Sequence, residues 1–253
     1  MTVSPVIVVL PVEGSAASTT TTNVGPRRRL PRDAQRRRVY LAETPLPSSP
    51  LPGLDACARF VDRVVGTLWW DARFPDRHLG MVPRLRPGNG ARQAFYREDA
   101  GGPTITLPRR YRTKGVVLHE LVHWAIGFDG GLPPHGRTFA RVLLDATEEF
   151  CGPERASELA ASYRAQRVHV AKPARVGPDG RHRYGWDERL RLGRGKLVEV
   201  RYVVTNPGHA ACDSVASGEF VGYTRGASVI QLAGLDRAVC PVQTKAVYDV
   251  RYL

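Results

Sequence analysis

The sequence is poor in cysteine and lysine and has no long apolar segment. Its four cysteines are Cys57, Cys151, Cys212 and Cys240. None forms a CxxC pair, so no cysteine zinc ribbon is predicted, and free thiols in a cytoplasmic protein are expected, with two disulfides as the alternative for an exported one. No apolar run approaches the roughly 20 residues of a transmembrane helix. The early run at 5–11 lacks a preceding basic segment, so neither a membrane span nor a signal peptide is expected.

The charge balance is strongly basic. The chain has 37 lysines and arginines against 24 aspartates and glutamates, which gives a formal net charge of +13. A basic chain favours polyanions such as nucleic acid. Only four of these residues are lysine, however, and an excess of arginine also accompanies a GC-rich coding sequence. Nucleic-acid binding is therefore an open alternative, and the composition indicates no oligomeric state.

Composition divides the chain into four parts. Residues 1–30 contain the low-complexity run STTTTN and a basic run, which predict a disordered basic arm. Residues 31–171 mix helical and strand-like patterns and predict an α+β domain. Residues 172–194, rich in glycine, proline and basic side chains, predict a linker. Residues 195–253 hold strand-like runs and predict a small all-β module, so a chain ending near Ala171 is expected to fold alone.

Hydrophobic periodicity predicts the individual elements. Helices are expected at 54–70, 115–126, 137–150 and 154–168. Strands are expected at 81–86, 91–98 and 103–107, and in the C-terminal module at 197–205, 219–224, 228–232 and 238–252. Glycine-rich turns between the first three strands favour antiparallel pairing, and Thr113 is a candidate N-cap for the second helix.

That second helix carries a chemically distinctive pattern. The stretch VVLHELVHW places His119 and His123 four residues apart. On a helix such positions share one face, so both imidazoles can bind one metal ion. Glu120 leaves that face by about 100°, which lets it contact a water on the metal. This is the HExxH arrangement of zinc hydrolases, in which the glutamate is the general base.

The surroundings of the motif favour a metal site over a purely structural role. The other residues of the stretch are apolar, so the helix is expected to be buried. Buried polar side chains need partners, and hydrogen bonds within the core are one way to supply them. Burying two imidazoles and a carboxylate together without a metal is nevertheless hard.

A catalytic zinc usually has three protein ligands and an open position for water. The metzincin pattern, with a further histidine soon after HExxH, is absent. His135, in PHGRTF, is the best candidate for the third ligand, because it follows a short loop and precedes the next predicted helix. Asp129 is a weaker alternative. Glu148 and Glu149 are the available counterparts of a thermolysin-type glutamate on a later helix.

These segments resemble the SprT-like (Spartan-type) zinc metallopeptidases, which also combine a helix, short antiparallel strands, an HExxH helix and an HGxxF/W segment. The matching segments here are HELVH at 119–123 and HGRTF at 135–139. The stretch RDAQRRRVY at 32–40 is similar to the opening of an actinobacterial group of HExxH metallohydrolases. The resemblance covers roughly residues 31–170.

The resemblance implies a zincin-like (SprT-like) domain with a short antiparallel sheet and an active-site helix. It also implies Zn²⁺ as cofactor and Glu120 as the base. The implied zinc ligands are His119, His123 and His135. Many SprT-like proteins end in a cysteine zinc ribbon that this chain lacks, so DNA-linked substrates do not follow. The expected function is zinc-dependent hydrolysis of a protein or peptide substrate. The alternative is a nucleic-acid- or protein-binding adaptor whose zincin domain is vestigial or structural.

Overall fold

The computed structural model describes residues 31–46, 48–75, 81–89, 93–127, 132–204, 211–224, 229–234 and 239–253. The expected arm at 1–30 and the candidate ligand Asp129 lie outside these residues. In the described part the chain is mixed α+β. No helix there is both long enough and apolar enough to cross a membrane.

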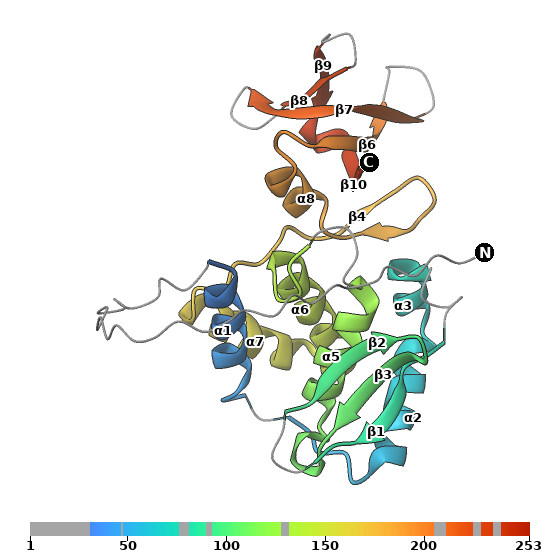
Figure 1. The fold of residues 1–253 in the computed structure, drawn as a ribbon, viewed down its shortest axis with the longest axis vertical. Helices are drawn as coiled ribbons and strands as arrows, with labels where there is room; N and C mark the ends of the chain where they lie inside the picture. Colours follow the sequence, from blue (N-terminus) through green and yellow to red (C-terminus); the bar gives the residue numbers. More distant parts are fainter. Residues whose placement is uncertain are drawn as a thin grey trace, which may run out of the picture.

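The first structural unit packs helices against a small sheet (Figure 1). Its helices are α1 Pro31–Glu43, α2 Leu54–Val65, α3 Leu68–Arg73, α5 Lys114–Ile126, α6 Arg137–Cys151 and α7 Pro153–Ala165, with the short 3-10 turn η1 Arg109–Tyr111. Its strands are β1 Arg84–Pro87, β2 Phe95–Asp99 and β3 Gly102–Leu107. One hydrophobic cluster joins these elements, and α5 contributes the unbroken buried run 117–125.

Most predicted helices of this unit are confirmed. The helices expected at 115–126, 137–150 and 154–168 are α5, α6 and α7. The single helix expected at 54–70 is wrong, because the chain breaks there into α2 and α3. Gly66 ends α2, and the Thr67 side chain caps α3 by accepting a hydrogen bond from the Trp70 backbone at 3.2 Å. A glycine followed by an N-cap residue ends one helix and begins the next.

The small sheet is mixed, whereas the turn pattern predicts antiparallel pairing throughout. Its strand order is β1-β3-β2; β2 and β3 are antiparallel, and β1 and β3 are parallel. The tight turn after Asp99 closes the β2–β3 hairpin, whereas β1 and β2 lie on opposite sides of β3 and are not paired with each other. β2 is consequently an edge strand of this sheet, and it contacts α5.

Helix α1 is not predicted from the sequence patterns, because its arginine-rich segment has only a narrow apolar face. In the structure it packs against α7. Val39 and Ala42 are fully buried, and the Ser162 hydroxyl donates to the Ala42 carbonyl at 2.7 Å. This packing brings the C-terminal turn of α1, with Tyr40 and Glu43, against the HExxH helix.

The segment 172–194, which the sequence predicts to be a linker, is structured. It contains β4 Arg175–Val176, β5 His182–Arg183 and α8 Trp186–Leu192. The antiparallel sheet that follows has the order β10-β6-β7-β8-β9 (Figure 1). Its strands are β6 Leu197–Val204, β7 Cys212–Thr224, β8 Val229–Ala233, β9 Val239–Gln243 and β10 Val247–Tyr252. The single run expected at 238–252 is wrong, because the 3-10 turn η3 Thr244–Ala246 divides it.

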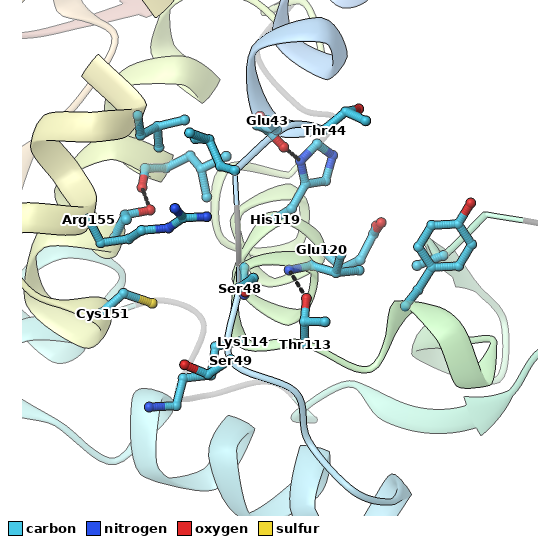
Figure 2. Close-up of a pocket in the computed structure, with 18 of the residues that line it drawn as sticks. Glu43, Thr44, Ser48, Ser49, Thr113, Lys114, His119, Glu120, Cys151 and Arg155 are labelled. Atoms are coloured by element: carbon cyan, nitrogen blue, oxygen red, sulfur yellow. Dashed lines mark hydrogen bonds and ion pairs between the residues drawn. The ribbon is translucent and has the colours of Figure 1, made fainter. Parts of the chain in front are cut away.

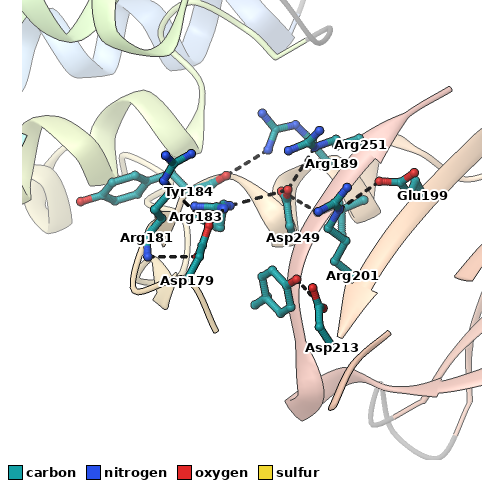
Figure 3. A network of polar contacts seen from close by, with 12 residues as sticks. Asp179, Arg181, Arg183, Tyr184, Arg189, Glu199, Arg201, Asp213, Asp249 and Arg251 are labelled. Carbon is teal, nitrogen blue, oxygen red and sulfur yellow. Dashed lines mark hydrogen bonds and ion pairs between the residues drawn. The ribbon is translucent and has the colours of Figure 1, made fainter. Parts of the chain in front are cut away.

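The segment between the first unit and the C-terminal sheet contributes side chains to the hydrophobic clusters of both. Tyr184 belongs to the hydrophobic cluster of the first unit, whereas Trp186 belongs to that of the sheet. Figure 3 shows a polar network beside them, in which Arg183 lies 3.8 Å and Arg251 3.1 Å from the buried carboxylate of Asp249. The chain between the two clusters is therefore held by packing and charge.

Candidate metal site

The HExxH helix begins at the predicted cap. Thr113 accepts a hydrogen bond from the Val116 backbone at 3.3 Å (Figure 2), which satisfies one of the unpaired N–H groups at the start of α5. The motif side chains are nearly enclosed, with exposed fractions of 5% for His119, 5% for Glu120 and 7% for His123. The helix thus buries two imidazoles and a carboxylate, as its apolar sequence predicts.

Three histidine nitrogens converge on one point. The Nε2 atom of His123 lies 3.1 Å from that of His135 and 3.3 Å from that of His119, and the remaining separation is 3.3 Å. Imidazoles bound to a tetrahedral zinc at about 2.0–2.1 Å would have their nitrogens about 3.3 Å apart. The spacing therefore fits a single zinc ion.

A carboxylate from α1 fixes the orientation of the first histidine. Glu43 Oε2 lies 2.7 Å from His119 Nδ1 (Figure 2), and the Tyr163 hydroxyl donates to Glu43 Oε1 at 3.1 Å. A carboxylate accepts the proton of Nδ1, which leaves the lone pair of Nε2 for a metal. Burial lowers the pKa of His119, but the charge and hydrogen bond of Glu43 outweigh it, so the pKa is raised.

The pKa values of the other two imidazoles favour the neutral form, which can bind a metal ion. Burial, with the neighbouring His119 charge, lowers the pKa of His123 strongly and that of His135 to about 3. Metals bind imidazole in its neutral form, so these shifts favour ligation at neutral pH. Phe139 packs on all three rings, with centroids 4.5–4.9 Å away, and Tyr40 lies 5.0 Å from His135. These aromatic rings therefore form part of the wall around the three imidazoles.

The position of His135 depends on a carboxylate from α8. Glu188 is 1% exposed and accepts from the Thr138 backbone at 2.8 Å and from the Thr138 hydroxyl at 2.6 Å. The Arg137 backbone donates to it at 3.2 Å. These donors are the first N–H groups of α6, directly after His135. A Cβ at Gly136 would lie 2.9 Å from Glu188 Oε1, so this close approach requires glycine.

Glu120 lies off the ligand face, as the motif predicts. Burial raises the pKa of its carboxyl, and the charge of His119 and the backbone N–H of Tyr96 oppose that rise. Tyr96 is on the edge strand β2, so the carboxylate lies between the HExxH helix and the sheet. A carboxylate with a raised pKa is a better proton acceptor at neutral pH.

Two cavities meet at Glu120. The smaller has a volume of about 560 Å³ and is lined by residues that include His119, while the larger, about 1120 Å³, is lined by residues that include His123 and His135. Tyr40, Ala94 and Glu120 line both. The two cavities therefore adjoin at these residues beside the histidines, and together they are called the cleft, with the smaller and the larger cavity as its two arms.

The structure brings the sequence-predicted ligands together. One nitrogen from each of His119, His123 and His135 lies within 4.8 Å of the others. Glu148 and Glu149 are exposed on the last turn of α6, outside this group. Sequence reasoning missed the partners from other elements. Glu43 had a usable signal, because Tyr40 and Glu43 are one helical turn apart and so share a face of α1. Glu188 had none, because only the tertiary fold brings α8 to α6.

Comparison of the chain with protein-family models, curated proteins and solved structures finds no match. The SprT-like resemblance thus rests on the segments quoted above, and what the site can do follows from its geometry.

Proposed function

We propose that this chain is a zinc-dependent metallohydrolase that cleaves peptide bonds. The observation that carries the proposal is the convergence of three histidine Nε2 atoms beside the buried carboxylate of Glu120. Three imidazoles leave one position of a tetrahedral zinc open, which is the ligand count of catalytic zinc sites. A purely structural zinc site would gain nothing from Glu120, because this carboxylate is not a ligand and its burial costs free energy.

Zinc, when bound, supplies a water with a pKa near 7 and a positive charge that polarises a carbonyl group. The residues of the chain supply the proton transfers. Glu120 accepts the proton of the attacking water and then donates it to the leaving amine. Its raised pKa suits both roles, because the group must lose and gain the proton near neutral pH.

The choice of a peptide substrate is supported by the edge strand. Residues Gln93 and Ala94 line the smaller cavity, and Ala94, Phe95 and Tyr96 line the larger. The start of β2 and the residues before it therefore follow the cleft past Glu120. A strand edge offers backbone donors and acceptors to an extended peptide, which can add to the sheet as a further strand.

The test compares wild type with Glu120→Gln, which keeps the shape of the side chain and removes the base. Zinc is measured by elemental analysis, and hydrolysis is measured with casein and with a fluorogenic peptide mixture. We expect hydrolysis to fall by about 10²–10⁴-fold with unchanged zinc content. Glu148→Gln is the matched control, since Glu148 is exposed and does not belong to the converging group of histidines, and it should behave as wild type.

Two outcomes would overturn the proposal. One is a Glu120→Gln chain that cleaves as fast as wild type. The other is a zinc-loaded wild-type chain that cleaves nothing, which would instead favour an adaptor with a structural zinc site.

A further inference from the structure

We propose that the larger arm of the cleft recognises acidic side chains, so that the substrate is a peptide segment with glutamate or aspartate on one side of the cleaved bond. This inference rests on the proposed function, because it names the substrate class of the same site. It is carried by the charges that line the two arms of the cleft, which differ.

The larger arm is lined by arginines from three separate elements. They are Arg36 and Arg38 on α1, Arg137 on α6 and Arg191 on α8. The carboxylates that line the same arm are Glu120 and Glu188. Glu188 accepts three hydrogen bonds from the start of α6 and lies 3.7 Å from Arg191, but the four arginines outnumber the two carboxylates. The arm is therefore cationic beside the candidate metal site.

Most of these guanidinium groups have no carboxylate partner. In the part of the chain that the structure describes, Arg36, Arg38 and Arg137 form no salt bridge. The Nε atom of Arg137 is buried without a hydrogen-bond partner among the described residues. Arg191 lies 3.7 Å from Glu188 and is half exposed. A buried donor without a partner is costly, so a ligand that supplies acceptors is favoured here.

The smaller arm differs in its chemistry. Its cations are Lys114 and Arg155, and Arg155 is paired with Glu158 at 2.6 Å. Figure 2 shows this arm around Ser48, Ser49 and Cys151. Leucines also line it, namely Leu46, Leu143 and Leu159. This arm therefore suits an uncharged or apolar side chain, and the acidic preference belongs to the other side of the cleaved bond.

A peptide fits these observations better than a nucleic acid. The start of the edge strand β2 and the residues before it line both arms, and the edge of a sheet can align an extended peptide by strand addition. The carboxylate of Glu120 stands where the two arms meet, and it would repel a continuous row of phosphates. An acidic peptide can place a neutral backbone at Glu120 and its carboxylates beside the arginines.

Binding is tested with the full-length, zinc-loaded Glu120→Gln chain, so that recognition is measured without turnover. The probes are fluorescent decapeptides with a common apolar residue and three glutamates, three glutamines or three lysines on its amino or carboxyl side. We expect one of the two glutamate peptides to bind about tenfold tighter than its glutamine counterpart. That preference should shrink in about 1 M salt, where the screening length is about 3 Å.

Two neighbouring arginines provide a matched pair of variants. Arg36 and Arg37 are both exposed on α1, but only Arg36 lines the cleft. Arg36→Glu should reduce the preference for glutamate about fivefold, and Arg37→Glu should leave it unchanged. Arg191→Gln gives a second, milder variant on a different element, with the same direction of effect. Zinc content and melting temperature show that each variant is folded.

Equal binding of the three peptide classes, or equal effects of Arg36→Glu and Arg37→Glu, would overturn this inference. So would binding of a short single-stranded oligonucleotide that depends on Arg36 while peptides show no preference. The inference and the proposed function fail separately. Wild type that cleaves peptides without an acidic preference refutes only the inference, and selective binding of acidic peptides by a chain that hydrolyses none refutes only the hydrolase.

Discussion

The candidate metal site has two halves that are held by different means. His119 and His123 lie on one buried helix, and their spacing is fixed by the helix itself. His135 lies at the end of a loop, and its position depends on the cap that Glu188 provides from a distant part of the chain. The first half is a local property of the sequence, whereas the second is a property of the whole fold.

The C-terminal part of the chain therefore helps to position a ligand of the candidate metal site. Glu188 is on α8, whose Trp186 and Leu190 are buried in the core of the C-terminal sheet. The same helix therefore contributes to that core and caps the helix after His135. The proposed hydrolase should be sensitive to changes in α8, although no residue of α8 is a candidate ligand.

The largest effect is expected where the loop half is removed outright. His135→Ala deletes one of the three converging nitrogens, and a site with two ligands should lose most of its zinc. Elemental analysis after gel filtration should show close to one zinc per chain in wild type and a strong loss in the variant. Full retention of zinc in His135→Ala would remove it from the ligand set and direct attention to Asp129.

A smaller effect is expected on the helix half. Glu43→Ala removes the acceptor of the His119 Nδ1 proton, and loss of such a partner typically costs 10–100-fold in metal affinity. Glu43→Gln keeps an acceptor oxygen and should lose less. Competition with a chromophoric zinc chelator measures both. Equal affinities in wild type and Glu43→Ala would show that the Glu43 contact does not orient the ligand.

The loop half should respond to Glu188→Ala in a different way. Two backbone N–H groups and a hydroxyl then lose their acceptor at a buried site, which should lower the free energy of unfolding by about 1–3 kcal/mol. Zinc affinity should fall several-fold with it, because His135 precedes the uncapped turn. Glu154→Ala is the control, since Glu154 is an exposed acid in the first turn of α7. Thermal unfolding with and without zinc measures both effects.

Truncation of the chain also tests whether the position of His135 depends on α8. A chain ending near Ala171 lacks Glu188 and also Tyr184, which is buried in the first hydrophobic cluster. The composition of the sequence predicts that this shorter chain stays soluble and keeps its zinc, whereas the contacts of Glu188 predict weaker zinc binding than in the full chain, by at least as much as in Glu188→Ala. Wild-type affinity in the truncated chain would show that the first unit fixes His135 without help.

The smallest effect is expected from Tyr163→Phe. The variant removes the hydroxyl that donates to Glu43 Oε1, while Glu43 Oε2 keeps its contact with His119. One hydrogen bond of this kind contributes about 0.5–1.5 kcal/mol, so zinc affinity should fall only a few-fold. A loss as large as that of Glu43→Ala would mean that Tyr163, rather than the carboxylate, controls the orientation of His119.

Much of the site could be predicted from the sequence because it depends on residues that are close together in the chain. The four-residue spacing of His119 and His123, the off-face Glu120 and the Thr113 cap are all consequences of helix geometry. His135 could be ranked first because a short loop returns it. Helix α1 could not be predicted, because its burial comes from packing on α7 rather than from a broad apolar stripe.

The role of α8 could not be predicted from the sequence for a similar reason. Its segment reads as a linker, rich in glycine and charge, yet Glu188 is among the most buried acidic residues of the described chain. A charged residue is buried when backbone donors meet it, and those donors come from a helix about 50 residues earlier in the sequence. The parallel pairing of β1 with β3 likewise depends on a crossing of the chain, which turn residues alone do not encode.

The central claim is that three histidines form an open zinc site, and X-ray absorption at the zinc edge of the purified full chain tests it most directly. The account predicts one zinc bound by three imidazole nitrogens and one light-atom ligand from water, at about 2.0–2.1 Å. The spectrum of the His135→Ala chain should lose an imidazole contribution or the zinc altogether. Sulfur ligands, or an imidazole count that is the same in wild type and His135→Ala, would contradict the account.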